Sequence, residues 1–332
     1  MNSRLKIERI KKTLWELREH ETCCELCPRE CKVNRKKGEK GFCQMGREPF
    51  LSHALLHYGE EPVLSGYGDW NQEKSNGSHR NGSGALFFTG CHLKCPFCQN
   101  YQLSWLNQGK QVTSQQLAEH MLSLQQKGAL NINLVSPTHF LIPILEALKQ
   151  AYKEGFTIPV VYNSNGYEKT EVVQKLDGIV DIYLPDLKYH SSSLSQKLSG
   201  VPDYFPKASQ AILEMHRQQP QLVVDDNNAA QRGLIIRHLI LPGMSSDSLK
   251  LLEWINSHLD SSVCLSLMSQ YHPCFKAPPE LQKCLSPQEF HKVLAQAKKM
   301  DLDTLFYQPE PFSLQEHLVP DFSLPDPFGF GK

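Results

Sequence analysis

Three closely spaced cysteines are the residues of this chain whose spacing points to one kind of chemistry. Cys91, Cys95 and Cys98 lie in the stretch GCHLKCPFCQNYQLSW, residues 90–105, separated by three and then two residues. A structural zinc site has four ligands, often as pairs two residues apart. Three thiolates in one loop instead suit a cubane 4Fe-4S cluster, because they hold three irons and leave the fourth free for a small molecule. A zinc knuckle or three buried thiols are the alternatives.

The residues around these cysteines resemble those of a known family. CxxxCxxC resembles the signature of the radical S-adenosylmethionine (SAM) enzymes. The flanking residues are Gly90, Pro96, Phe97, Gln99 and Asn100. They look like those of the glycyl-radical-activating branch, which includes pyruvate formate-lyase activating enzyme, and they are most similar to its uncharacterised relatives. The resemblance covers about residues 84–275. It implies a 4Fe-4S cluster and SAM as cofactors, with Asn100 among the cofactor-binding residues.

Composition and charge limit the class of protein. The 332 residues carry 35 Lys and Arg against 35 Asp and Glu, which gives no basic surface of the kind that binds nucleic acid. No apolar run approaches the ~18 residues of a membrane span, and no secretory segment opens the chain. Eleven cysteines, without a signal peptide and mostly in two short segments, fit metal binding in a reducing compartment. We therefore expect a cytoplasmic protein with no membrane or nucleic-acid partner.

A second group of cysteines lies near the N-terminus. Cys24, Cys27 and Cys31 form CxxCxxxC, and a basic turn then leads to Cys43, while Cys23 is spare. Four thiolates suit zinc or an auxiliary iron–sulfur cluster, and the spacing does not choose between them because both accept tetrahedral sulfur. A metal would supply much of the folding energy of so polar a segment. A cluster of reduced thiols is the alternative.

Short β-rich runs alternate with helical patterns from Ala85 onward, which is typical of a parallel sheet built from βα units. The predicted strands are 85–89, 132–135, 159–163, 179–185, 234–241 and 263–268. The predicted helices lie near 4–20, 113–127, 140–154, 169–176, 203–217, 245–259 and 287–299. Six repeats indicate an α/β fold of the partial (β/α)6 barrel type, and the family resemblance implies the same.

Four segments follow from these patterns. Residues 1–65 are predicted to form an N-terminal helix and a cysteine-rich metal-binding segment, and residues 66–84, rich in Gly, Asn and Ser, a flexible loop. Residues 85–308 are the predicted radical SAM barrel. Residues 309–332, rich in proline, are predicted to be an extended tail.

Polar residues follow the predicted strands at the edge where barrels of this type place their catalytic groups. The set comprises the residues after the second to fourth strands and one within the fifth strand: Ser136, Thr138, Asn163, Ser164, Asn165, Asp186 and Lys188, and then Arg237. Singly, each is explained by a helix cap, a turn or a solvated ion pair. Together they are better explained by a ligand at this edge, and SAM, which the resemblance implies, offers an amino group, a carboxylate, a ribose and an adenine for them to bind.

The resemblance implies roles for some of these residues. NSNG, residues 163–166, looks like a segment that contacts the cofactor. Asp186 and Lys188 resemble a DxK motif whose lysine meets the methionine carboxylate of SAM, and we predict a catalytic role for both. Relatives carry a GGE-like motif after the second strand, where this chain has SPTH. We assign the amino-group site there to Ser136 and Thr138.

The implied activity is that of a radical SAM oxidoreductase. One electron, delivered by a donor such as flavodoxin or ferredoxin, would cleave SAM to methionine and a 5′-deoxyadenosyl radical, which abstracts hydrogen from the substrate. The leading prediction for the substrate is a backbone glycine of a partner protein. The alternatives are another peptide or a small molecule, or a non-catalytic metal-binding protein.

Overall fold

The structure is a mostly parallel sheet covered by helices, as the α/β prediction requires. It is a computed structural model that describes residues 2–66, 81–308 and 318–329. Seven parallel strands form the body of the sheet: β2 (Ser83–Phe88), β4 (Ile132–Val135), β5 (Val160–Ser164), β6 (Ile182–Pro185), β8 (Ala230–Leu239), β9 (Cys264–Met268) and β10 (Thr304–Tyr307). The strand order is β10-β9-β8-β6-β5-β4-β2-β1-β3, an open sheet like that of a partial barrel.

Four of the strands were not predicted from the sequence. β1 (Phe50–His57) pairs antiparallel with β2, and β3 (Lys110–Gln111) pairs with β1. β7 (Val223–Val224) forms a short ribbon with β8. β10 adds a seventh parallel strand at the edge of the sheet, where its four residues are only half-buried.

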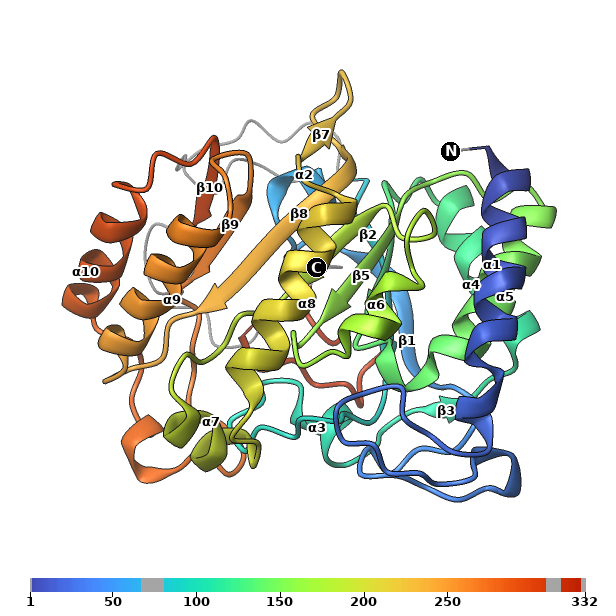
Figure 1. The fold of residues 1–332 in the computed structure, drawn as a ribbon, viewed down its shortest axis with the longest axis horizontal. Helices are drawn as coiled ribbons and strands as arrows, with labels where there is room; N and C mark the ends of the chain where they lie inside the picture. The colour runs from blue at the N-terminus through green and yellow to red at the C-terminus, as the bar shows by residue number, and fades with distance from the viewer. Residues whose placement is uncertain (1, 67–80, 309–317, 330–332) are drawn as a thin grey trace.

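Helices cover one face of the sheet, and several of them pack on each other in pairs (Figure 1). The longer helices are α1 (Ser3–Leu17), α4 (Ser114–Gln126), α5 (Leu141–Lys153), α8 (Tyr204–Gln218), α9 (Ser245–His258) and α10 (Pro287–Ala297). The shorter ones are α2 (Pro62–Ser65), α3 (Tyr101–Ser104), α6 (Thr170–Gln174) and α7 (Ser192–Ser199). α1 packs on α5, so the N-terminal helix lies against the main body of the protein.

Alternation along the strands divides the side chains between the two faces of the sheet. Val160 and Tyr162 of β5 belong to the large core under the helices. Val161, between them, belongs to a second core on the other face, where the side chains of α2 pack against it. On that face the side chains become polar toward the carboxyl ends of the strands, as at Asn163 and Arg237. The fold therefore gives this face an apolar floor and a polar rim.

The C-terminal stretch 318–329 also packs on the sheet. Phe322 and Phe328 are buried against Phe87 of β2, with ring centroids 5.4 Å apart in both pairs. The side chain of Gln102 bonds to the Asp321 carboxylate at 3.2 Å. This part of the predicted tail is therefore held on the sheet. The rest of it, 309–317 and 330–332, and most of the predicted loop, 67–80, lie outside the described residues.

No helix in the described part of the chain combines the length and apolar character needed to cross a membrane.

Gly166, just after β5, lies so close to the backbone of Asp186, just after β6, that no side chain fits at this position. Its φ is +79°, and a Cβ atom would lie 2.0 Å from the carbonyl oxygen of Asp186. Gly128 has a similar φ of +86°, with no atom within 4 Å of the same position.

We expect Gly166→Ala to be far more destabilising than Gly128→Ala. The left-handed backbone alone costs about 1–2 kcal/mol with a Cβ, which is the loss expected for Gly128→Ala. Gly166→Ala adds a collision with backbone and should lower the free energy of unfolding by at least about 4 kcal/mol. Urea denaturation of both variants measures the difference, and equal losses would contradict the close approach.

Candidate functional site

The cysteine loop begins immediately after β2 and lies against the N-terminal segment. Gly90 has a φ of +81°, and a Cβ atom there would meet the Met45 side chain at 2.5 Å and the Cys43 carbonyl oxygen at 2.8 Å. The guanidinium of Arg29 donates to the His92 carbonyl at 2.8 Å. The two cysteine-rich segments, separate in sequence, are therefore neighbours in the fold, at the end of the sheet where α3 lies (Figure 1).

Polar groups from distant elements contact the sulfurs of this loop. The amide of Asn165, just after β5, donates to Cys91 Sγ at 3.6 Å. The hydroxyl of Ser199 lies 3.1 Å from Cys95 Sγ, and the hydroxyl of Tyr189 donates to the same sulfur at 3.8 Å. Hydrogen bonds to sulfur stabilise cluster-bound thiolates and tune the cluster potential. These contacts are those that a cysteine-bound cluster needs.

The Cys95 side chain is buried, those of Cys91 and Cys98 are half-buried, and the three thiols affect one another electrostatically. Burial raises the pKa of Cys91 and of Cys98, the latter to about 12, and the nearby Cys95 thiol raises both further. A bound metal reverses this balance, because a coordinating thiol loses its proton outright. The donor set and its surroundings therefore fit a 4Fe-4S cluster.

A single metal ion places stricter demands on its ligands. Within the described ranges, no group of three or more His, Cys, Asp or Glu side chains is arranged to hold one ion. A cubane differs, because each thiolate binds its own iron and the sulfurs lie farther apart. The four N-terminal cysteines thus do not form a preformed zinc site, and the zinc or auxiliary cluster there stays a prediction.

Arg35 is the unexpected feature of the N-terminal cysteines. Its buried guanidinium donates to Cys24 Sγ at 3.0 Å and to Cys43 Sγ at 3.4 Å. It also donates to the carbonyls of Met45 and Gly46. A buried guanidinium needs acceptors for its N–H groups, and these two sulfurs and two carbonyls supply them. The sequence showed only a basic turn at this point.

Asp186 and Lys188 form the predicted pair after β6. Lys188 Nζ lies 2.5 Å from Asp186 Oδ2, and both side chains are largely buried. Burial alone would lower the pKa of Lys188, but the Asp186 carboxylate and the Cys95 thiol outweigh it and raise the pKa above its ordinary value. Lys188 also acts electrostatically on Cys98. The structure thus brings the lysine close to the cysteine loop.

Other predicted cofactor residues lie at the same edge of the sheet. The Ser136 amide donates to the Asn163 carbonyl at 2.9 Å and links the ends of β4 and β5. Ser164 Oγ accepts from the Gly166 amide at 3.3 Å. Asn100 is half-buried at the start of α3, directly after the cysteine loop. Their predicted contacts with the cofactor stay predictions.

Thr138 has a different immediate partner from the one predicted. It is fully buried, and its hydroxyl donates to Glu168 Oε1 at 2.7 Å. Tyr162 donates to Thr138 Oγ1 at 3.2 Å, in the same network. Burial raises the pKa of Glu168 to about 8, against the hydrogen bonds that lower it. Glu168, two residues after NSNG, was not identified from the sequence.

Arg237 is held by two carboxylates that sequence reasoning also missed. Its guanidinium bonds to Glu61 Oε1 at 2.7 Å and pairs with Glu60 as well. Asn133 donates to Glu60 at 2.7 Å, and the site is buried. Arg237 is on the same face as Asn163, but its charge is already neutralised by Glu60 and Glu61. Its predicted cofactor role stays a prediction.

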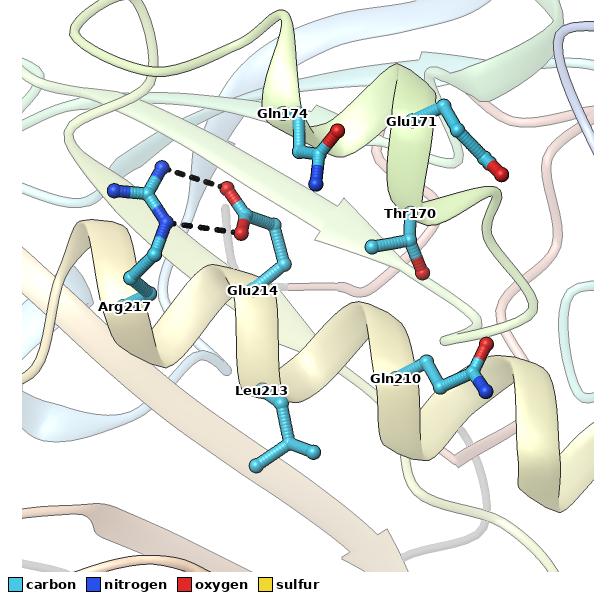
Figure 2. Close-up of a pocket in the computed structure, with 7 residues that line it drawn as sticks. All are labelled: Thr170, Glu171, Gln174, Gln210, Leu213, Glu214 and Arg217. Atoms are coloured by element: carbon cyan, nitrogen blue, oxygen red, sulfur yellow. Dashed lines mark hydrogen bonds and ion pairs between the residues drawn. The ribbon is translucent and has the colours of Figure 1, made fainter.

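A surface depression of about 450 Å³ lies between α6 and α8 (Figure 2). Glu214 and Arg217 form an ion pair at its edge, 2.8 Å apart. Figure 2 shows the side chains that line it lying along these two outer helices. It contains none of the predicted site residues.

Comparison with known proteins identifies the family. The radical SAM superfamily model matches residues 86–224, which include the cysteine loop. The chain is 32% identical over 295 residues to the uncharacterized protein MJ0674 of Methanocaldococcus jannaschii, covering 85% of this chain and 76% of that protein. The chain belongs to the radical SAM superfamily.

Solved structures with related folds are more distant. A radical SAM methyltransferase from Sphaerobacter thermophilus is 12% identical, with a TM-score of 0.49, over 69% of this chain and 67% of its own. Methylornithine synthase (PylB) is 17% identical, with a TM-score of 0.44, over 68% of this chain and 70% of its own.

We expect Glu168→Gln to change the pH dependence of stability. In the folded protein the carboxyl stays protonated up to about pH 8, whereas in the unfolded chain it ionises near 4.5. Ionisation therefore favours unfolding across this window, by about 1.4 kcal/mol per pKa unit. Relative to E168Q, the wild type should lose stability from pH 5 to pH 8. Urea titrations test this, and parallel curves would contradict it, because changed hydrogen bonds give only a constant offset.

Proposed function

We propose that this protein is a radical SAM enzyme in which Cys91, Cys95 and Cys98 hold a 4Fe-4S cluster. The observation that carries the proposal is the cysteine loop, whose buried sulfurs face hydrogen-bond donors from three separate segments and lie close to Lys188. When bound and reduced by one electron, the cluster would supply the reductive cleavage of SAM to methionine and a 5′-deoxyadenosyl group that takes hydrogen from the substrate and leaves as 5′-deoxyadenosine.

The chain's own residues would bind and orient the cofactor. Lys188 offers an ammonium group to the methionine carboxylate, and its pairing with Asp186 keeps it charged and in place. Ser136, Asn163 and Asn165, at the ends of β4 and β5, would take the amino and ribose groups. The predicted Thr138 and Ser164 are buried beside Glu168, so their proposed role is to position these chain ends. Asn100 and Arg237 flank this set.

We further propose the glycyl-radical-activating type as the subclass. Its support is the sequence around the cysteines, from Gly90 to Asn100. A radical enzyme that acts on another peptide or a small molecule has the same cofactors, so the substrate alone separates the two. The discriminating observation is a glycyl radical signal in electron paramagnetic resonance when pyruvate formate-lyase is supplied as substrate.

We expect the anaerobically reconstituted protein to bind iron and sulfide and to release 5′-deoxyadenosine when dithionite and SAM are added. Cys98→Ser should lose most of the cluster, because it removes one of three iron ligands. Cys284→Ser, at an exposed cysteine, is the matched control and should keep both properties. Iron and sulfide analysis and chromatography measure the outcome. A wild-type protein with a full cluster but no 5′-deoxyadenosine would refute the proposal.

The N-terminal cysteines are proposed to hold a second metal centre, either zinc or an auxiliary cluster. Arg35 supports this, because its buried guanidinium donates to the sulfurs of both Cys24 and Cys43 and so holds these two side chains on one group. Metal analysis of the same preparations distinguishes the two metals. Bound zinc would identify a zinc site, and more than four irons per chain would identify an auxiliary cluster. If neither metal is found, these cysteines are free thiols and the proposed second centre is wrong.

Lys188→Met is expected to weaken SAM binding about 10- to 100-fold, which corresponds to the loss of one charge-assisted hydrogen bond. Methionine has a similar length and no charge. Lys197→Met, at an exposed lysine paired with Glu280, is the control and should bind SAM normally. Isothermal titration of the reconstituted proteins measures both affinities. Equal affinities for wild type and K188M would show that Lys188 does not bind the methionine carboxylate of SAM.

A further inference from the structure

The inner face of the sheet, opposite the helices, carries a buried cluster of charged side chains. Arg237 of β8 bonds through Nε to Glu61 Oε1 at 2.7 Å, and its guanidinium also pairs with Glu60. Glu60 Oε1 accepts from the Asn133 amide at 2.7 Å. Asn133 belongs to β4, which is separated from β8 by β5 and β6, so Glu60 spans the inner face between these two strands.

This cluster holds more negative than positive charge. Two carboxylates contact one guanidinium, which leaves one negative charge in excess. Burial acts to raise the pKa of Glu60, but Arg237 and its other partners hold it below the ordinary value, so the carboxylate is ionised. His57 Nδ1 lies 3.6 Å from Glu60 Oε1, yet burial lowers the pKa of this imidazole and keeps it uncharged at neutral pH. Because a buried excess charge is costly, the cluster favours a bound cation.

Two side chains beside the charges have buried oxygens without a hydrogen-bond partner among the described residues. Asn133 is fully buried, and its Oδ1 accepts no hydrogen bond although its Nδ2 donates to Glu60. Ser266 of β9 is also fully buried and its hydroxyl has no partner. It lies directly opposite Arg237 in the register of β8 and β9, so both side chains are on the inner face. Since buried polar atoms are nearly always hydrogen-bonded, a ligand with N–H groups would satisfy these oxygens together with the excess charge.

The surroundings indicate which kind of cation fits. In the part of the chain that the structure describes, no three His, Cys, Asp or Glu side chains are arranged around one metal ion. Val161, Ile235 and Cys264 form an apolar floor beside the cluster, suited to carbon atoms of a ligand. The side chains of Arg237 and Glu60 keep 12% and 7% of their surface exposed, so the cluster is not sealed. An organic cation that donates hydrogen bonds therefore fits better than a metal ion.

The cluster also adjoins the residues proposed to bind SAM. The backbones of Asp186 and Arg237 form a bridge between neighbouring segments, and Asp186 is paired with Lys188. Lys188 therefore has its own carboxylate and does not offset the excess charge at Glu60. A ligand held at Glu60 would lie beside the cofactor, where a substrate must be placed to lose hydrogen.

We propose that Glu60, Glu61, Asn133 and Ser266 form an inner cation site, which binds an ammonium or guanidinium group of the substrate. The inference rests on the proposed function and deepens it, because it names the chemical class of the substrate. Glu60 supplies the excess negative charge, and Asn133 Oδ1 and Ser266 Oγ accept N–H groups. The cation belongs either to a small amine or to a lysine or arginine side chain of a peptide, and its chemistry at this site is the same.

Binding of small cations tests the site without any reduction step. The probes are n-butylammonium and n-butylguanidinium, with pentanamide as a neutral molecule of similar size that keeps N–H donors. Isothermal titration of the reconstituted protein with SAM should show both cations binding at least about 10-fold more tightly than pentanamide, because only a cation offsets the excess charge. Equal affinities for the cations and pentanamide, or no binding of either cation, overturn the site.

Two variants locate the bound cation. Glu60→Gln removes the excess charge and should weaken cation binding about 10- to 100-fold. Glu146→Gln, at a carboxylate of α5 that pairs with Arg47, is the matched control and should leave cation binding unchanged. Ser266→Ala should weaken it about 3- to 10-fold and keeps the fold even where E60Q does not, because its hydroxyl bonds to none of the described residues. Circular dichroism checks the fold, and wild-type cation affinity in S266A or in folded E60Q overturns the site.

A peptide probe identifies the source of the cation. Acetyl-Arg-Gly-amide is compared with butylguanidinium and with its citrulline counterpart, which has the same shape and no charge. Tighter binding of the arginine peptide supports a peptide substrate at the inner cation site, and tighter binding of butylguanidinium supports a small amine there. Equal affinities of the arginine and citrulline peptides contradict the recognition of charge.

Formation of 5′-deoxyadenosine with dithionite and SAM reports separately on the proposed function. Cation binding without this product refutes the proposed function and leaves the inner cation site in place. The product without cation binding supports the proposed function and overturns the site.

Discussion

Keeping three cysteine sulfurs together inside the protein is the constraint on which the rest of this structure depends. Negative charge on neighbouring buried thiolates is costly unless hydrogen bonds or cations offset it. The offset comes from elements far apart in the chain: Asn165 after β5, Tyr189 and Ser199 around α7, and Lys188 after β6. Only a parallel sheet, whose carboxyl ends meet at one edge, brings these segments to one loop.

Close backbone approaches complete this arrangement. Gly90 lets the cysteine loop lie against the Cys43 carbonyl, and Gly166 lets the turn after β5 lie against the Asp186 carbonyl. Each glycine removes a side chain where two segments would otherwise be forced apart. The N-terminal cysteine segment therefore packs directly against the cysteine loop at Cys43. Arg35 is buried in the same region, where its guanidinium contacts the Cys43 sulfur.

The sequence was sufficient where the signal is local. The alternation within β5 and the helical spacing of α5 appear within single segments, so six parallel strands and the main helices were predicted to within a few residues. The spacing of Cys91, Cys95 and Cys98 is also a local signal, because all three lie within one short segment. Pairings between distant segments were not predictable: Arg237 with Glu60 and Glu61, or Thr138 with Glu168. Glu168 directly follows NSNGY, and only its burial distinguishes it from an ordinary surface glutamate.

The inner face of the sheet shows how these distant pairings affect the site. α2 closes its floor with apolar side chains, and the preceding Glu60 and Glu61 neutralise Arg237 just above that floor. The backbones of Asp186 and Arg237 form a bridge between neighbouring segments, but their side chains have different partners. Arg237 is paired with Glu60 and Glu61, and Asp186 is paired with Lys188. The buried glutamates thus neutralise Arg237 in the strand beside the Asp186–Lys188 pair, and each of the two cations has its own carboxylate partner.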